Sequence, residues 1–88
     1  MRMVLRYSSA FQRMYRKLSS QQQQWSDMAL KLFADNPFHP QLRNHKLRGS
    51  KQGLRSISAG YDLRIIYIEE GGHAIVLFLM IGDHETVY

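Results

Sequence analysis

Three side chains in the last third of the chain have the types that phosphate-ester chemistry needs. Arg64 stands inside an otherwise apolar stretch, and His84 and Tyr88 follow the next apolar stretch. An arginine among leucine and isoleucine is not there for packing, because charged side chains are rarely buried without a partner. Histidine donates or accepts a proton near neutral pH, and a guanidinium holds phosphate through two parallel hydrogen bonds. Together these residues predict cleavage of a phosphodiester.

A second histidine completes the set that metal-free RNA cleavage requires. Such cleavage needs a base for the 2′-hydroxyl, an acid for the leaving 5′-oxygen and positive charge beside the phosphorane. His84 and His45 can take the two proton roles, and Arg64 can supply the charge. The four histidines show no metal-binding spacing, so the sequence predicts neither a metal nor a cofactor. His39 and His73 are expected to be structural or solvated.

Each of these assignments has a plain alternative, and for His45 it is a simple phosphate contact or no role at all. Arg64 could be the ion-pair partner of Asp62 or Glu85, and His84 could be a surface residue of a charged tail. Tyr88 could stack on a base or close the core.

Positive charge is concentrated in the middle of the chain. The net formal charge is +5 and the isoelectric point is near 9.9, which is typical of nucleic-acid partners. After Arg64 there are four acids and no lysine or arginine. The basic block is expected to contact phosphates without reading sequence, through Arg43, Lys46, Arg48, Lys51 and Arg55. A solvated basic face that only keeps the protein soluble is the alternative.

The sequence predicts a single domain, residues 1–88, whose helices and strands position these residues. Serines before two helical patterns predict helices over residues 9–17 and 21–35, joined as an antiparallel hairpin. The second helix has one apolar stripe, interpreted as core: Trp25, Met28, Ala29, Leu32 and Phe33. Strands are predicted at 3–7, 54–58, 63–68 and 73–80, with a long polar connection over 37–53. This order favours an α+β fold, with both helices on one face of an antiparallel sheet.

The composition excludes some kinds of site and limits the expected cellular location. The 88 residues include no cysteine, so disulfides and thiolate metal sites are excluded. The longest apolar run, residues 74–81, is too short to cross a bilayer, and no apolar segment follows Arg2 and Arg6 as in a secretory signal. We therefore expect a cytoplasmic protein with no membrane partner.

Four short motifs, in order along the chain, resemble the RelE superfamily of type II toxins. They are NPFHP at 36–40, HKLRG at 45–49, YDLRIIY at 61–67 and IGDHETVY at 81–88. The similarity is greatest to the YafQ/RelE-like messenger-RNA interferases, which cleave in or near the ribosomal A site. It implies a RelE-like fold, messenger RNA and the ribosome as partners, and neutralisation by an acidic antitoxin that docks on the basic block.

The resemblance also assigns roles to individual residues. His45 and His84 match active-site histidines of YafQ-like members, and Asp62, included among the candidate catalytic residues, matches an acidic position of the same group. Arg64 matches the strand arginine that acts on the scissile phosphate, and Tyr88 matches the C-terminal aromatic that orients the substrate. The chain departs from the pattern in two places. Ser58 replaces a further histidine, and Met80 replaces an arginine found in several nucleases.

Two other functions remain open from the sequence. The ParE branch shares the fold and inhibits DNA gyrase, and a catalytically silent member would be a binding module. His45 and His84 argue against the first, whereas Ser58 and Met80 are the features that favour the second.

Overall fold

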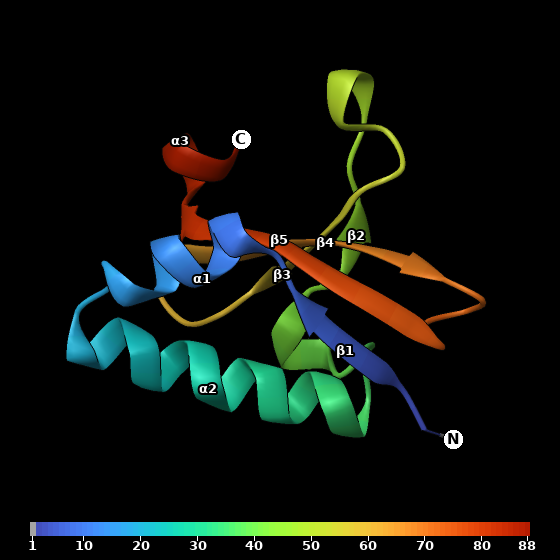
Figure 1. Ribbon diagram of the computed structural model, residues 1–88, viewed down its shortest axis with the longest axis horizontal. Helices are drawn as coiled ribbons and strands as arrows, with labels where there is room; N and C mark the ends of the chain where they lie inside the picture. The colour runs from blue at the N-terminus through green and yellow to red at the C-terminus, as the bar shows by residue number, and fades with distance from the viewer. Residues whose placement is uncertain (1) are drawn as a thin grey trace.

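The fold is a five-stranded sheet with two helices against one face. The computed structural model describes residues 2–88, and the strand order is β1-β5-β4-β3-β2 (Figure 1). The elements are β1 (Val4–Tyr7), α1 (Ser9–Arg16), α2 (Ser20–Asp35), η1 (Pro40–Leu42), β2 (His45–Lys46), η2 (Gly49–Lys51), β3 (Arg55–Ser58), β4 (Leu63–Glu70), β5 (Ile75–Asp83) and α3 (His84–Val87). The predicted α+β class and helix hairpin are confirmed.

Serine caps begin both long helices where the sequence predicts. The Ser8 hydroxyl accepts the N–H of Phe11 at 3.0 Å and so begins α1. At the start of α2, Ser19 and Gln22 form a reciprocal capping box, with contacts of 3.1 and 3.0 Å. Across residues 2–88, no helix is both long enough and apolar enough to span a bilayer.

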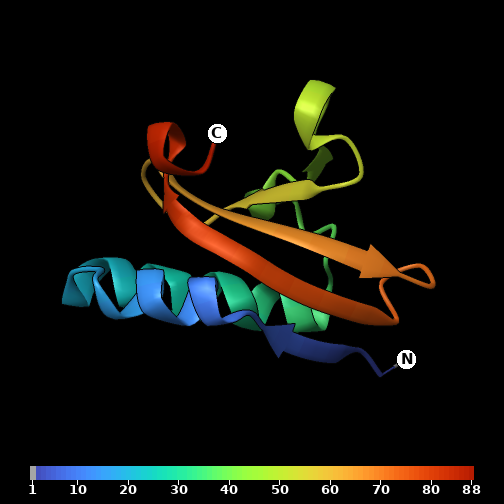
Figure 2. The same ribbon diagram turned by 45° about the horizontal axis from the view of Figure 1, so that its top comes forward.

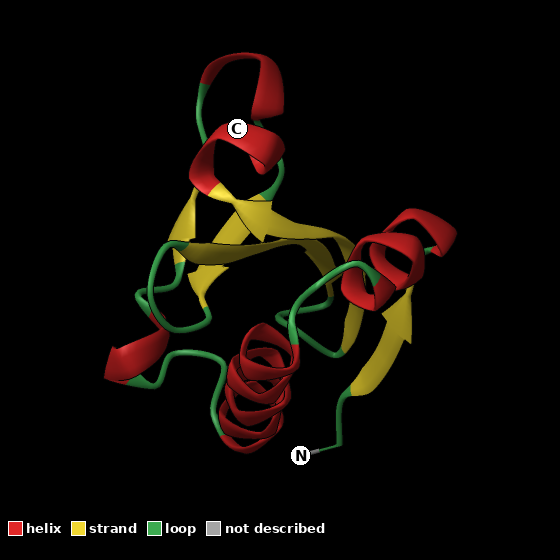
Figure 3. Cartoon of the chain, turned by 90° about the vertical axis from the view of Figure 1, so that its left-hand side faces the viewer, coloured by secondary structure: helices red, strands yellow, loops and turns green. Residues whose placement is uncertain are grey.

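Aromatic rings fill the layer between the helices and the sheet. The Phe33 ring lies edge-on to those of Tyr67 and Phe78, with centroids 5.0 and 5.2 Å away. Phe11 of α1 packs on Phe78 as well, at 6.0 Å. Figures 2 and 3 show α1 and α2 on the same side of the sheet, so this layer is the core.

The apolar stripe of α2 is only partly core, contrary to the prediction. Ala29 and Phe33 are buried, but Met28 is 65% exposed, and Trp25 and Leu32 are half-buried. Trp25 and Leu32 pack against the core without being fully buried, whereas Met28 lies outside it. All three side chains line a groove.

The sheet is mixed, where the sequence predicted an antiparallel one. β1 pairs in parallel with β5, in the register Val4↔Ile75 to Tyr7↔Phe78, while β2 to β5 are antiparallel. A hairpin turn enforces an antiparallel pair, but a helical connection does not. β1 is followed by two helices, so its direction depends on tertiary packing that no local signal encodes.

The C-terminal segment, expected to be a polar tail after the last strand, is a short helix. Asp83 caps α3 by accepting the N–H of Thr86 at 2.7 Å, and this bond lowers the pKa of the Asp83 carboxyl. Gly82 permits the fold-back, since a Cβ there would lie 3.2 Å from the Thr86 side chain. As a result, Ile66 and Val87 are buried on the face opposite α1 and α2.

Gly60 is a contact point between the turn before β4 and helix α2. Its φ is +86°, and a Cβ there would lie 2.9 Å from the Trp25 indole. Gly60→Ala is expected to lower the free energy of unfolding by about 1–2 kcal/mol through its left-handed backbone and by about 1–3 kcal/mol more through overpacking. Gly53→Ala is the matched control, because φ is +93° there but nothing lies within 4 Å. Equal losses in urea denaturation would contradict this account.

Candidate active site

The predicted catalytic residues lie on or beside the face of the sheet opposite α1 and α2, which we call the open face. Side chains alternate along a strand, and the register pairs Arg64 with Ser58 on one side and Gly82 on the other. The next row is Ser56, Ile66 and Met80. Helix α3 and the η2 turn rise from this same side of the sheet in all three ribbon views (Figures 1 to 3). The departures at Ser58 and Met80 therefore fall on the same face as Arg64.

Helix α3 brings His84 and Tyr88 back over the strands. The Tyr88 hydroxyl hydrogen-bonds the hydroxyl of Ser56, and the His84 ring packs edge-on to Tyr88 with centroids 4.4 Å apart. His45 of β2 is the register partner of Ser56. Four residues from three separate parts of the chain thus follow one another across this face: His45 beside Ser56 by strand register, Ser56 to Tyr88 by a hydrogen bond, and Tyr88 to His84 by ring packing. Both histidines are exposed to solvent.

Arg64 is free to bind an anion. Its guanidinium is half-buried and makes one hydrogen bond, from Nη1 to the carbonyl of Leu63 at 3.1 Å. Within residues 2–88 the one close contact between a basic and an acidic side chain joins His73 Nδ1 to Glu69 Oε1, at 3.6 Å. The alternative in which Arg64 pairs with Asp62 or Glu85 is therefore wrong, and its charge is available to a ligand.

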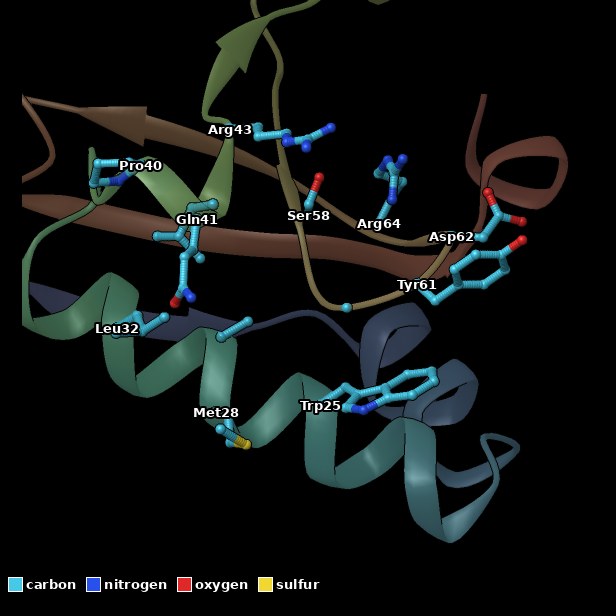
Figure 4. A pocket seen from close by; sticks show the side chains of 13 residues that line it. Trp25, Met28, Leu32, Pro40, Gln41, Arg43, Ser58, Tyr61, Asp62 and Arg64 are labelled. Carbon is cyan, nitrogen blue, oxygen red and sulfur yellow. The ribbon is translucent and has the colours of Figure 1, made fainter.

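Asp62 lies at the margin of the site and not in the row of histidines. It occupies the turn before β4 with φ of +49° and an exposed side chain. A groove of about 870 Å³ begins here, lined at this end by Asp62, Ser58, Arg64 and Arg43 (Figure 4). Arg43 thus lies near Arg64, a proximity that no local pattern in the sequence predicts.

A polar network around Asn44 holds in place the segment that leads into His45. The Asn44 amide donates to the Pro37 carbonyl at 2.8 Å and to the Tyr67 hydroxyl at 2.6 Å, and its oxygen accepts from Arg55 Nε at 2.9 Å. His45 comes next in the chain, and its Nδ1 lies 2.9 Å from the carbonyl of Arg43. The long polar connection is therefore anchored just where it carries a candidate catalytic histidine.

His73 completes this network from the β4–β5 turn. It is 7% exposed, its Nε2 lies 2.8 Å from the Tyr67 hydroxyl, and its ring packs edge-on to Phe38 at 5.1 Å. Burial lowers the pKa of His73 below its usual 6.5, with a smaller opposing effect from Glu69 and a smaller lowering by Arg55. The expectation that this histidine is structural agrees with its place in the network.

The His73 pKa makes stability depend on pH. Because the folded pKa is below the unfolded one, the unfolded chain binds more protons, and stability falls as pH drops through and below about 6.5. We expect the free energy of unfolding, measured with urea, to be lower at pH 5 than at pH 8. His73→Asn, which tolerates the φ of +70°, should flatten this slope. His39→Asn is the control, and an unchanged slope in His73→Asn would contradict the assignment.

The predicted RNA-contacting cations divide into two groups. Arg43, Lys46 and Arg48 are exposed, and Lys51 is half-buried on η2. Arg55 differs, because it donates to Asn44 and its guanidinium lies 5.4 Å from the centroid of the Phe38 ring. Its contacts are within the protein, so Arg55 has a structural task that the other four lack.

Two residues of the site were not singled out from the sequence. Ser56 hydrogen-bonds Tyr88, and Asn44 holds the segment before His45. The only local signal for Ser56 was its alternation with Ile57 in a strand. Its partner is 32 positions away and comes into reach only through α3.

The geometry provides groups for both halves of a proton-transfer reaction at a phosphate. Two exposed histidines lie at different parts of one face, and the same face carries the Arg64 guanidinium, which has no carboxylate partner among residues 2–88. Tyr88 is held by Ser56 at one end and by the His84 ring on its side. Such an arrangement suits general acid and base roles around a charge-stabilised phosphate.

Comparison with known proteins identifies the family. No curated protein sequence matches the chain. Among solved structures, YafQ from E. coli strain BL21(DE3) has a TM-score of 0.81 at 18% identity, covering 98% of each chain. The E. coli DinJ–YafQ toxin–antitoxin complex gives 0.80 at 17% identity, covering 100% of this chain and 99% of that one. The YoeB/ParE toxin from Agrobacterium tumefaciens gives 0.76 at 15% identity, covering 93% and 99%.

These solved structures show that the chain shares their fold, and a match to a family of sequences shows which family it belongs to. The family described as YafQ, a bacterial toxin of a type II toxin-antitoxin system, matches residues 3–88. The resemblance inferred from the four motifs is thereby confirmed. The chain belongs to the YafQ family of type II toxins.

Proposed function

We propose that this toxin is a metal-independent endoribonuclease that cleaves messenger RNA on the ribosome and so arrests translation. The observation that supports this most is the open face. His84, His45, Arg64 and Tyr88 come from four different elements or termini, yet they share one face, and Arg64 has no acidic partner in the described chain. A purely structural role gives no reason for such a guanidinium on the same face as two exposed histidines.

The proposed reaction uses no group beyond the protein and the RNA. One histidine removes the proton from the 2′-hydroxyl, whose oxygen attacks the adjacent phosphorus. The other histidine gives a proton to the departing 5′-oxygen, and Arg64 neutralises the charge on the phosphorane. The products are a 2′,3′-cyclic phosphate and a 5′-hydroxyl. Tyr88 holds the base beside the scissile bond by stacking.

We further propose where the large partners bind. Arg43, Lys46, Arg48 and Lys51 would contact phosphates of messenger or ribosomal RNA, and we leave Arg55 out because its guanidinium is engaged by Asn44 and Phe38. An acidic antitoxin would cover the same four cations, as the E. coli YafQ is named together with DinJ in a toxin–antitoxin complex. Competition for one basic surface would then explain neutralisation.

Induction of the chain in a bacterium tests this function. We expect growth arrest, with discrete cuts in abundant messages that primer extension detects and that a translation inhibitor abolishes. Arrest with intact messages and an SOS response would overturn the proposal in favour of a gyrase inhibitor. Free growth without any antitoxin would overturn it in favour of a silent binding module.

A further inference from the structure

The groove that begins beside Arg64 extends well past the open face. It runs between α2 and the β3–β4 turn, and its volume of about 870 Å³ is within the usual range of roughly 300–1,000 Å³ for ligand sites. Arg43, Ser58 and Arg64 line the end nearest the sheet (Figure 4). The apolar end is lined by Trp25, Met28, Ala29, Leu32 and Tyr61.

Two features of this groove are not needed for folding. Tyr61 is 85% exposed and Met28 is 65% exposed, so neither side chain contributes to the core. Arg43 is exposed and, like Arg64, has no ion-pair partner within residues 2–88. The groove thus combines two free guanidiniums with an exposed aromatic ring.

Trp25 gives the groove a fixed wall. Its indole contacts the backbone of Gly60 so closely that a Cβ there would be 2.9 Å away. The Tyr61 ring comes next in the chain, on the rim opposite α2 (Figure 4). One aromatic ring is therefore held by packing, and the other is free to turn toward a ligand.

We propose that this groove binds the nucleotides next to the scissile phosphate, with a base against Tyr61 and Trp25 and its phosphate at Arg43, beside the scissile phosphate at Arg64. The inference rests on the proposed nuclease function and extends it with a substrate subsite. Cationic grooves with aromatic platforms are the usual way to bind single-stranded nucleic acid without sequence preference. Arg64 and Ser58 belong to both the open face and the groove, so a strand held at Arg64 would continue directly into it.

Charge favours RNA over an acidic peptide as the occupant. Both cations of the groove are at the sheet end, and the residues that line its apolar half include no cation. An acidic helix along α2 would find no charge partner there. Asp62 on the rim would repel a phosphate beside it but can accept a hydrogen bond from a base amino group.

Fluorescence of Trp25 tests the subsite directly, because it is the only tryptophan of the chain. The probe is a hexanucleotide of RNA with 2′-O-methyl groups, which cannot be cleaved by this chemistry. We expect saturable quenching, and Tyr61→Ala should raise the dissociation constant by about 5- to 100-fold, the loss of one stacked base. Tyr61→Phe keeps the ring and should bind like the parent.

A parallel assay of message cleavage on translating ribosomes separates the two proposals. We expect Tyr61→Ala to cut the same bond with the same rate at saturation and a higher half-saturating concentration. If messages are cut but the RNA does not change Trp25 fluorescence and Tyr61→Ala behaves like the parent, the proposed subsite is overturned and the proposed nuclease function is retained. If RNA is neither bound nor cut, both the subsite and the nuclease function are overturned. Quenching by an acidic antitoxin peptide but not by RNA would also overturn the subsite.

Discussion

Arg64→Ala is expected to reduce message cleavage by about 100- to 1,000-fold, the usual cost of removing one preorganised charge from a transition state. The guanidinium lies on the open face and its one hydrogen bond is to the neighbouring Leu63 carbonyl. No carboxylate competes with a phosphate for it within the described chain. The cleavage rate on programmed ribosomes measures the effect, and growth arrest after induction should be lost with it.

Two variants make the Arg64 result specific. Arg64→Lys keeps the charge but not the paired hydrogen bonds, so an intermediate rate is expected. Arg6→Ala removes an exposed arginine of the edge strand β1, which β5 separates from β4, and should leave the rate unchanged. Since Arg64 makes so few contacts, its alanine variant should unfold at nearly the parental urea concentration. An Arg64→Ala protein as toxic as the parent would refute its role.

His84→Ala is expected to slow cleavage by about 100- to 10,000-fold, the range for loss of one general acid or base. His84 is exposed at the start of α3, and its ring contacts Tyr88 at 4.4 Å. A residue that only supports Tyr88 would leave the shape of the pH–rate profile intact. Loss of a proton-transfer residue would remove one limb of the pH–rate profile, which is the outcome that we expect.

The neighbouring acid provides the control for His84. Glu85→Gln changes an exposed side chain of the same helix and should retain the parental rate and profile. Asp83 should be left intact, because it caps α3 and thereby places His84 and Tyr88. If His84→Ala cleaves like Glu85→Gln, His84 is no part of the chemistry.

Local signals predicted most of the elements but not the way they meet. The serine caps of α1 and α2 and the three C-terminal strands follow from caps, periodicity and turns. The parallel direction of β1 and the two-residue strand β2 depend on contacts between distant segments, which propensity does not encode. Helix α3 had a local signal, Asp83 three residues before Thr86, that the polar composition of the tail concealed.

The residues of the site likewise divide into those that the sequence indicates and those that only the folded chain brings together. Arg64, His84 and His45 stand out by residue type, because a cation in an apolar strand and histidines beside polar turns are unusual. Ser56 and Asn44 do not stand out, since their contacts to Tyr88 and Tyr67 exist only once the sheet has formed. The groove could not be predicted either, because Met28 and Trp25 have the spacing of core residues, whereas in the structure Met28 is exposed, Trp25 is half-buried and both line the groove.

The most direct test of the central claim is a single-turnover assay on purified ribosomes that hold one message codon in the A site. The parent toxin is expected to cut within or beside that codon and to leave a 2′,3′-cyclic phosphate and a 5′-hydroxyl, whereas His84→Ala should leave the message intact on the same timescale. An intact message with the parent toxin, or cleavage that leaves a 5′-phosphate, would contradict the proposed chemistry.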